Sequence, residues 1–268
     1  MNFSQYRKRE GTIERGSVNV LSGIQSQVFR PLPDVLRAEA IVERLSTAIS
    51  LGLLRRGEQL PVENQLTVLF GVATATVRDA LQTLRDQGII ETRRGRSGGT
   101  FIIGSPPANP AALNDRLLAL SMAELRDLED EQLATGLAAV RLVIERAFPH
   151  DLDRLERIIR TMGEAETSEA CMRADSRFQI ELAALAQSER LMTTQMRLLT
   201  ESIEILWSVL TVETDREWTM TDHLAIVTAL RAGDVSAAER AVRDHTARDF
   251  YRLIEARLDS LYPVDTRK

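Results

Sequence analysis

The chain has 268 residues, of which 44% are hydrophobic and 4% aromatic, and its formal net charge is −5. This length is enough for two domains with hydrophobic cores, and a composition rich in Leu, Ala, Arg and Glu favours a mostly helical protein. The single cysteine, Cys171, excludes a disulfide framework within one chain, and there is no apolar run of about eighteen residues to predict a transmembrane helix.

Residues 1–33 show no sustained periodicity and carry a net charge of +3, so we expect a flexible N-terminal arm. Their basic beginning is not followed by an apolar stretch, which excludes a secretory signal and makes the cytoplasm the expected location. Residues 34–104 carry a net charge of +1 and the rest of the chain −9. The local field, rather than the total charge, decides what each part can bind.

Residues 34–104 are expected to form a winged helix-turn-helix domain. Its first helix should cover residues 35–54, with Asp34 as the N-cap, and its second should cover residues 63–70 and end at Gly71. Apolar side chains recur on one face of each helix, and they are Ile41, Leu45, Ala48 and Ile49 in the first and Leu66, Leu69 and Phe70 in the second.

The third helix is predicted for residues 74–87, before Gly88. Its buried stripe consists of Val77, Ala80, Leu81 and Leu84. Thr74, Thr76 and Arg78 lie outside that stripe, near the start of the helix. A glycine turn between two short helices holds the second so that its first residues can meet base edges in the major groove.

Two strands are predicted for residues 89–92 and 100–103, and the stretch between them reads RRGRSGG. The glycines allow the positive φ angles of a hairpin tip. A basic hairpin beside a recognition helix suits phosphate or minor-groove contact, although the arginines alone would also fit a solvated loop.

These pieces resemble the DNA-binding domain of the GntR family of bacterial transcriptional regulators. The resemblance covers residues 35–103 and rests on LPVENQLTVLFGV, TVRDALQTLRDQGIIETRRGR and GGTF. It implies that Arg78 contacts DNA from the recognition helix, and that Arg94 and Gly95 at the wing tip enter the minor groove.

Two positions depart from the family pattern. The family usually has an arginine where this chain has Asn64, and many members have another where it has Thr74. An arginine pairing with guanine contributes about 1–3 kcal/mol of discrimination. We therefore expect Asn64, Thr74 and Thr76 to read a different operator.

Residues 105–112 are predicted to be a linker, because three prolines between 106 and 110 favour an extended spacer. Residues 113–262 then read as helical throughout, which predicts an all-α antiparallel bundle. The expected helix starts after the linker are Ser121, Asp151, Ser168, Ser188, Thr219 and Asp234.

Two histidines stand at matching positions of consecutive helices in this bundle. His223 and His245 are each about ten residues from the tight turn at Gly233 and Asp234, so antiparallel helices would bring them to a similar height. Asp175 and Gln179 share a face of another helix, at i and i+4. An aspartate and two histidines in a bundle core predict a divalent-metal site, and the alternative is that each is an ordinary core or surface residue.

This half resembles the FCD effector domain of the FadR subfamily of GntR regulators, through ADSRFQIELAALAQSERL and DHLAIVTALRAGDVSAAERAVRDH. That resemblance implies a metal held by one aspartate and three histidines, with a small carboxylate completing its shell. Asp175, His223 and His245 match three of those ligands. Gln179 stands where the remaining histidine would be, which leaves zinc, nickel or manganese binding in doubt.

The family also often has an arginine near the effector, where this chain has Gln132. We therefore name Gln132 and Gln179 as effector-binding candidates, with Arg126 as a cation that could replace the arginine. The effector would be a small molecule, by resemblance a carboxylate.

The sequence thus predicts a DNA-binding transcriptional regulator, a homodimeric repressor on a pseudo-palindromic double-stranded operator, with no membrane partner and no enzymatic activity. One alternative is a metal-dependent hydrolase or lyase that uses Asp175, His223 and His245. Another is a DNA-binding dimer whose bundle has lost its ligand.

Overall fold

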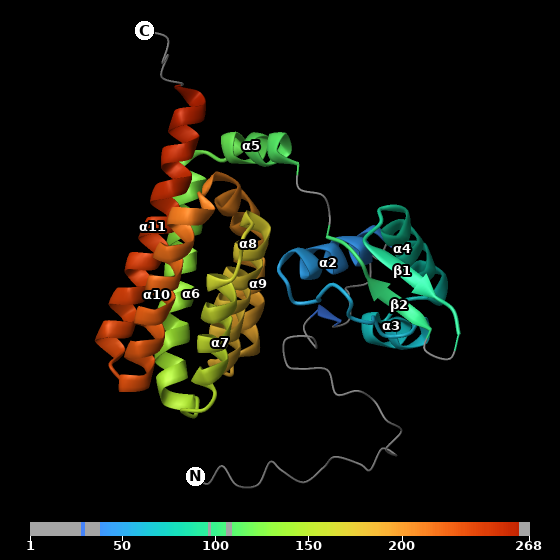
Figure 1. The fold of residues 1–268 in the computed structure, drawn as a ribbon, viewed down its shortest axis with the longest axis horizontal. Helices are drawn as coiled ribbons and strands as arrows, with labels where there is room; N and C mark the ends of the chain where they lie inside the picture. Colours follow the sequence, from blue (N-terminus) through green and yellow to red (C-terminus); the bar gives the residue numbers. More distant parts are fainter. Residues whose placement is uncertain (1–27, 30–37, 96–97, 106–108, 263–268) are drawn as a thin grey trace.

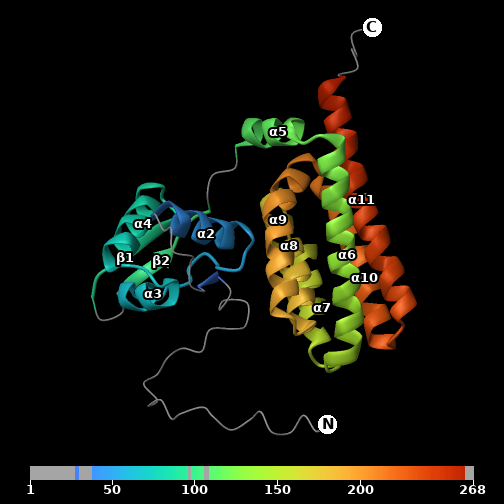
Figure 2. The same ribbon diagram turned by 180° about the vertical axis from the view of Figure 1, so that it is seen from behind.

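A computed structural model describes residues 28–29, 38–95, 98–105 and 109–262 of the chain. They form a small domain with helices and one two-stranded sheet, and a larger bundle of helices beside it (Figure 1). The same two parts are seen from behind in Figure 2. This is the predicted fold class. No helix in the described part of the chain is long and apolar enough to span a membrane.

The small domain contains α2 (Ala38–Ser50), α3 (Glu63–Phe70) and α4 (Thr74–Asp86). Helices α3 and α4 match the predicted ranges closely, whereas α2 ends four residues before the predicted residue 54, at a turn. The predicted start of the first helix and its cap, Asp34, lie outside the described residues. The apolar faces are buried as predicted, through Ile41, Leu45, Ala48, Ile49, Leu66, Phe70, Val77, Ala80, Leu81 and Leu84. Leu69 is only partly buried, although it packs against the same core.

The two described residues at the end of the predicted arm are buried. Val28 is 1% exposed and Phe29 is 2% exposed, and the Phe29 and Phe70 ring centroids are 5.8 Å apart. Burying side chains of this size contributes about 1.5–3 kcal/mol each. The prediction of a flexible arm is therefore wrong at these two positions, and the rest of residues 1–33 lies outside the described part.

Helix α3 ends as predicted, since Gly71 has φ 68° and its N–H donates to the Thr67 carbonyl. The wing consists of β1 (Ile90–Arg93) and β2 (Gly99–Ile102), which pair antiparallel with Ile90 opposite Ile102. Arg85 of α4 donates to the Thr92 hydroxyl over 3.3 Å. This contact joins α4 to the wing.

The bundle contains the other helices that the structure describes. They are α5 (Pro110–Ala119), α6 (Met122–Arg146), α7 (Leu152–Gly163), α8 (Ser168–Leu185), α9 (Glu189–Val209), α10 (Val212–Ala232) and α11 (Val235–Leu261). Helix α11 packs along α6 and α10, and α8 packs along α7 and α9. The long helices therefore surround a common interior into which α8, α10 and α11 can direct polar side chains.

Several predicted helix caps are confirmed. Ser121 and Glu124 form a reciprocal capping box at the start of α6, and the side chains of Ser188 and Asp234 cap α9 and α11. Asp151 precedes α7, but its carboxylate accepts from the Phe148 N–H and not from α7. The N-cap of α8 is Thr167, one residue before the predicted Ser168.

Two predicted helix boundaries are wrong. Pro110 does not extend the linker but is the first residue of α5, where its missing N–H is harmless and Asn109 caps the helix. Thr219 does not open a helix, because α10 begins seven residues earlier, at Val212. The Thr219 hydroxyl donates to the Asp215 carbonyl over 2.9 Å, a bond that satisfies it within the helix.

Helices α6 and α11 approach closely at Gly136, where an added Cβ would lie 2.7 Å from Cγ1 of Val242. We expect Gly136→Val to lower the free energy of unfolding by about 1–3 kcal/mol, because overpacking forces the two helices apart. Ala134→Val, at an exposed position of the same helix, should cost only about 0.7 kcal/mol or less. Urea unfolding of both variants measures the difference, and equal effects would contradict a close helix contact at Gly136.

Candidate functional site: a DNA-reading surface and a buried Asp/His centre

The DNA-contact candidates from the helix-turn-helix are accessible. Asn64 on α3 and Arg78 on α4 are exposed, and Thr74 and Thr76 are half-buried at the start of α4. The Arg78 guanidinium pairs with Glu63 of α3 at 2.8 Å, while its side chain stays 66% exposed. Arg78 is thus positioned between the two helices and remains able to reach a ligand.

The wing presents a second exposed cationic position. Arg94 and Gly95 follow β1 in the hairpin loop, and both are exposed. Gly95 has φ 112°, which favours glycine. The neighbouring Arg93 is less available, since it pairs with Glu91 and its guanidinium lies 4.6 Å from the Phe101 ring centroid. Figures 1 and 2 place α4 and the hairpin away from the bundle, whereas α2 faces it.

The predicted metal ligands converge inside the bundle. Asp175 comes from α8, His223 from α10 and His245 from α11, and one donor atom from each lies within 4.8 Å of the others. All three residues are buried. The His223 ring stacks on Phe178 with centroids 3.7 Å apart, and His245 meets His223 edge-on at 5.0 Å. Aromatic packing therefore fixes the orientation of both imidazoles.

The imidazole nitrogens at this centre lack hydrogen bonds. Nε2 of His223 and both ring nitrogens of His245 are buried and make no hydrogen bond of ordinary geometry to a described residue. The two His245 nitrogens lie 3.5 Å from the carboxylates of Asp222 and Asp249. Nε2 of His223 lies 3.4 Å from Oδ1 of Asp175, which is long for a hydrogen bond. Unpartnered buried polar atoms destabilise a fold, and a cation bound between the imidazoles and the carboxylate would satisfy them. These three residues fit a divalent metal.

Gln179 does not offer an oxygen to this centre. Its Nε2 donates to Oδ1 of Asp175 over 2.9 Å, and its Oε1 accepts from Gln132 at 2.7 Å and Gln195 at 3.0 Å. Both ends of the amide are therefore occupied by other side chains. In this arrangement Gln179 therefore does not fit as a fourth metal ligand, and the three ligands are Asp175, His223 and His245.

Acidic side chains around the histidines set their protonation. Burial lowers the pKa of His223, and it also disfavours the charged form of His245. Asp249, Asp222 and Asp175 outweigh that effect and raise the pKa of His245 to about 9. Burial raises the pKa of Asp249 to about 7.

The contacts of Asp175 keep it ionised. Burial acts to raise its pKa, but the interaction with His223, the charge of His245 and the Gln179 hydrogen bond hold the pKa below the ordinary value. Nε1 of Trp207 donates to the other carboxylate oxygen over 2.9 Å. The carboxylate is therefore both charged and oriented before any ligand arrives.

Three members of this environment were not predicted from the sequence: Trp207, Asp222 and Asp249. Asp249 follows His245 by four residues on α11, and this spacing places both residues on one helix face. The spacing could therefore have predicted that Asp249 lies near the centre. Trp207 has no such signal, because its contact with Asp175 joins residues 32 positions apart.

The effector candidates are divided. Gln132 and Gln179 touch each other and line a small cavity with Asp249 and apolar residues of α9 and α11. No arginine or lysine is among the described residues that line it. Arg126 is exposed on α6 and is not part of that lining. The structure therefore brings the two glutamines together without Arg126.

We expect Trp207→Phe to lower the free energy of unfolding by about 1–3 kcal/mol, since it leaves a buried, charged carboxylate without one of its donors. The chain has two tryptophans, and the other, Trp218, is 52% exposed. Trp218→Phe loses only a contact with Arg248 and should cost about 1 kcal/mol or less. Urea unfolding compares them, and an equal loss would argue against the Trp207–Asp175 bond.

Two family models match the chain. Residues 37–102 match the model described as "Bacterial regulatory proteins, gntR family", and residues 136–248 match the FCD domain. The first match covers the helix-turn-helix and wing. The second covers Asp175, His223 and His245. The DNA-contact candidates and the Asp/His centre therefore lie in two different family domains.

The chain is similar to curated proteins along most of its length. It is 45% identical over 236 residues to the HTH-type transcriptional regulator RmpR of Mycobacterium gastri, covering 87% of this chain and 86% of the relative. It is 26% identical over 223 residues to the HTH-type transcriptional repressor NanR of Klebsiella aerogenes, covering 81% and 85%. Among solved structures, Escherichia coli McbR/YncC matches 83% of this chain and 99% of its own, with a TM-score of 0.51 and 16% identity. This last likeness concerns the fold.

Proposed function

This chain belongs to the GntR family of bacterial regulatory proteins and carries an FCD domain, and we propose that it is a repressor that reads its operator through α4 and the wing. The observation that carries this proposal is the exposure of Arg78 on α4 and of Arg94 in the hairpin loop. Figure 1 shows α4 and the hairpin on the side of the small domain away from the bundle. The chain is a DNA-binding transcriptional regulator, not an enzyme, so the hydrolase or lyase alternative is not favoured.

Each contact residue has a distinct proposed role. Arg78 reaches base edges in the major groove from α4, with Thr74 and Thr76 beside it and Asn64 contacting from α3. Arg94 enters the minor groove, and Gly95 allows the backbone to approach it. Glu63 holds the Arg78 guanidinium in place until DNA replaces this exposed ion pair.

The proposed sensor lies in the bundle. Asp175, His223 and His245 would hold a divalent metal such as zinc, nickel or manganese, a Lewis-acidic cation to which an effector oxygen could bind. Their buried and unpartnered nitrogens support this assignment. Gln132 and Gln179 would bind the same effector, and Gln179 would exchange one of its present side-chain partners for it. The lining of their cavity contains no described cation, so a carboxylate effector would depend on the metal for its counter-charge.

The proposed assembly is a homodimer, because two recognition helices are needed for a two-fold symmetric operator with half-sites about one helical turn apart. We place the domain boundary in residues 105–109, before α5, and the protein in the cytoplasm, with the DNA that it would bind. The effector acts by binding the DNA-competent and the incompetent arrangements of the dimer with different affinities.

Selection of bound duplexes from a random DNA pool tests this proposal. Purified full-length protein should enrich a pseudo-palindromic sequence, and light scattering should give twice the mass of one chain. Bound DNA of no shared sequence, or a monomer that binds a single half-site, would contradict it.

A further inference from the structure

A wide groove lies between the winged domain and the bundle, at a different place from the Asp/His centre. Its volume is about 1060 Å³, and it is lined by the segment after α2, by α5 and by α8 and α9. The two domains touch at its edge, where a Cβ added to Gly52 would lie 3.1 Å from Cβ of Arg173. This volume is at the upper end of what small-molecule sites occupy.

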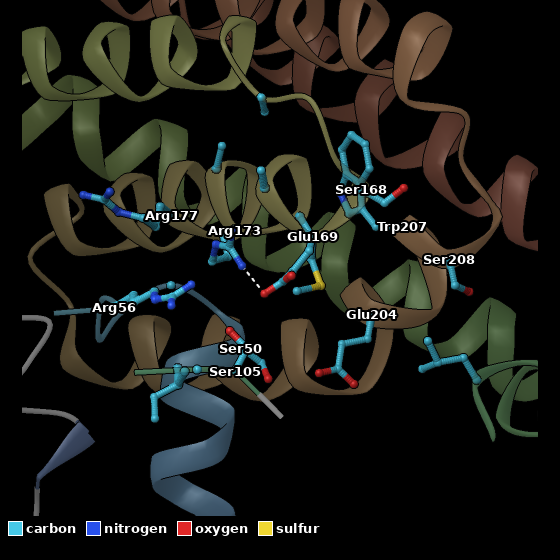
Figure 3. Close-up of a pocket in the computed structure, with 18 of the residues that line it drawn as sticks. Ser50, Arg56, Ser105, Ser168, Glu169, Arg173, Arg177, Glu204, Trp207 and Ser208 are labelled. Carbon is cyan, nitrogen blue, oxygen red and sulfur yellow. Dashed lines mark hydrogen bonds and ion pairs between the residues drawn. The ribbon is translucent and has the colours of Figure 1, made fainter. Parts of the chain in front are cut away.

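The groove carries an excess of positive charge. Its described lining includes five arginines and three glutamates. Two of the arginines are neutralised, because Arg173 pairs with Glu169 and Arg116 pairs with Glu204. The other three are Arg55, Arg56 and Arg177, and none forms an ion pair with a described residue. Figure 3 shows Arg56, Arg173 and Arg177 together at one end, with Glu204 and Trp207 at the other.

Arg177 is in an unfavourable electrostatic environment. It is half-buried on α8, and burial together with the nearby charge of Arg55 lowers its pKa. Glu181 and Glu58 attract it, but Glu181 also pairs with Arg154 at 3.2 Å, and Glu58 accepts from the Arg55 backbone N–H over 3.0 Å. The three guanidinium groups outnumber these two carboxylates, so an anion bound among them would offset the repulsion.

We propose that this groove is a second ligand site, for a small organic phosphate whose phosphate group is held by Arg55, Arg56 and Arg177. Guanidinium groups match phosphate because they donate pairs of parallel hydrogen bonds to its oxygens. The remaining volume, toward Trp207, would take the organic part of the ligand.

The groove is lined by both domains, and its helix α8 also carries Asp175, one of the proposed metal ligands. Arg55 and Arg56 belong to the winged domain, while Arg177 belongs to the bundle. Helix α8 carries Arg173 and Arg177 toward the groove and Asp175 toward the interior. A phosphate bound here would therefore bridge the two domains in this arrangement.

The test uses full-length protein and calorimetric titration with inorganic pyrophosphate and glucose 6-phosphate, with glucose as the uncharged control. We expect both phosphates to bind and glucose not to bind. Arg177→Gln should weaken phosphate binding about tenfold or more, since it removes charge-assisted hydrogen bonds. Arg141→Ala, an arginine on α6 that pairs with Glu239 outside the groove, should leave binding unchanged.

Thermal unfolding without ligand separates this role from a structural one. Arg177→Gln should be at least as stable as the unmodified protein, because the repulsion from Arg55 is relieved. If that variant does not fold, Arg56→Gln, at an exposed position, replaces it in the titration. No binding of either phosphate, or equal binding by the groove variants, would overturn the proposal. The proposal would also be overturned if Arg177→Gln and Arg56→Gln lost operator affinity while the unmodified protein bound neither phosphate. The arginines would then contact DNA and not a phosphate ligand.

Discussion

Arg78→Ala is expected to lower operator affinity about 5- to 150-fold, the loss that corresponds to one base contact of about 1–3 kcal/mol. The physical reason is the position of Arg78 in the first half of α4, where its side chain is 66% exposed and pairs with Glu63. Fluorescence anisotropy with the selected operator, at one fixed salt concentration, measures the change.

The matched control is Arg240→Ala, an exposed arginine on α11 at a position that faces no DNA in this account. Its operator affinity should equal that of the unmodified protein. The stability of Arg78→Ala should also change little, because an exposed ion pair contributes about 1 kcal/mol or less. An unchanged affinity for Arg78→Ala, or the same loss in both variants, would remove Arg78 from the recognition surface.

Gln179→His is expected to tighten zinc binding by about tenfold or more, since it adds an imidazole where the three-ligand centre lacks one. Gln179 already contacts Asp175 at 2.9 Å, so a ring at this position starts beside a ligand. Competition against a chromophoric chelator measures the affinity. Asp175→Asn should weaken zinc binding, because it removes the carboxylate that converges with the two imidazoles.

Gln195→His is the control for Gln179→His. Gln195 is also buried and donates to Gln179, but it is not among the residues that converge at the centre. It should leave zinc affinity unchanged or lower it. If Gln195→His tightens binding as much as Gln179→His, or if neither does, the centre is not built around Asp175, His223 and His245.

The sequence predicts most of the helices because their buried faces follow the helical period. The four apolar residues of α4, from Val77 to Leu84, are buried as their spacing predicts. Sequence periodicity does not predict burial that depends on contacts with distant parts of the chain. Val28 and Phe29 have no period of their own, yet both are buried in the core, where the Phe29 ring packs against Phe70.

Helix starts illustrate a second limit. Thr219 has the spacing of a cap, but a threonine inside a helix can satisfy its hydroxyl with the preceding turn. The sequence predicts Pro110 in the linker because proline breaks helices, whereas at the first position of α5 it is compatible with a helix. In both cases the residue type allows two structures, and the sequence alone does not choose.

The Asp/His centre was predictable in part. The turn at Gly233 places His223 and His245 at similar heights, and the structure brings them together with Asp175. The direction of the Gln179 amide was not predictable, because it depends on Gln132 and Gln195 from two other helices. Metal and effector binding at this centre stay predictions, as do the DNA contacts.

The structure of the full-length protein bound to its selected operator tests the central claim most directly. We predict that α4 lies in the major groove with the Arg78 guanidinium about 3 Å from a base edge, and that Arg94 lies in the adjacent minor groove. DNA held against another surface, with Arg78 still paired to Glu63 and Arg94 facing solvent, would contradict the account.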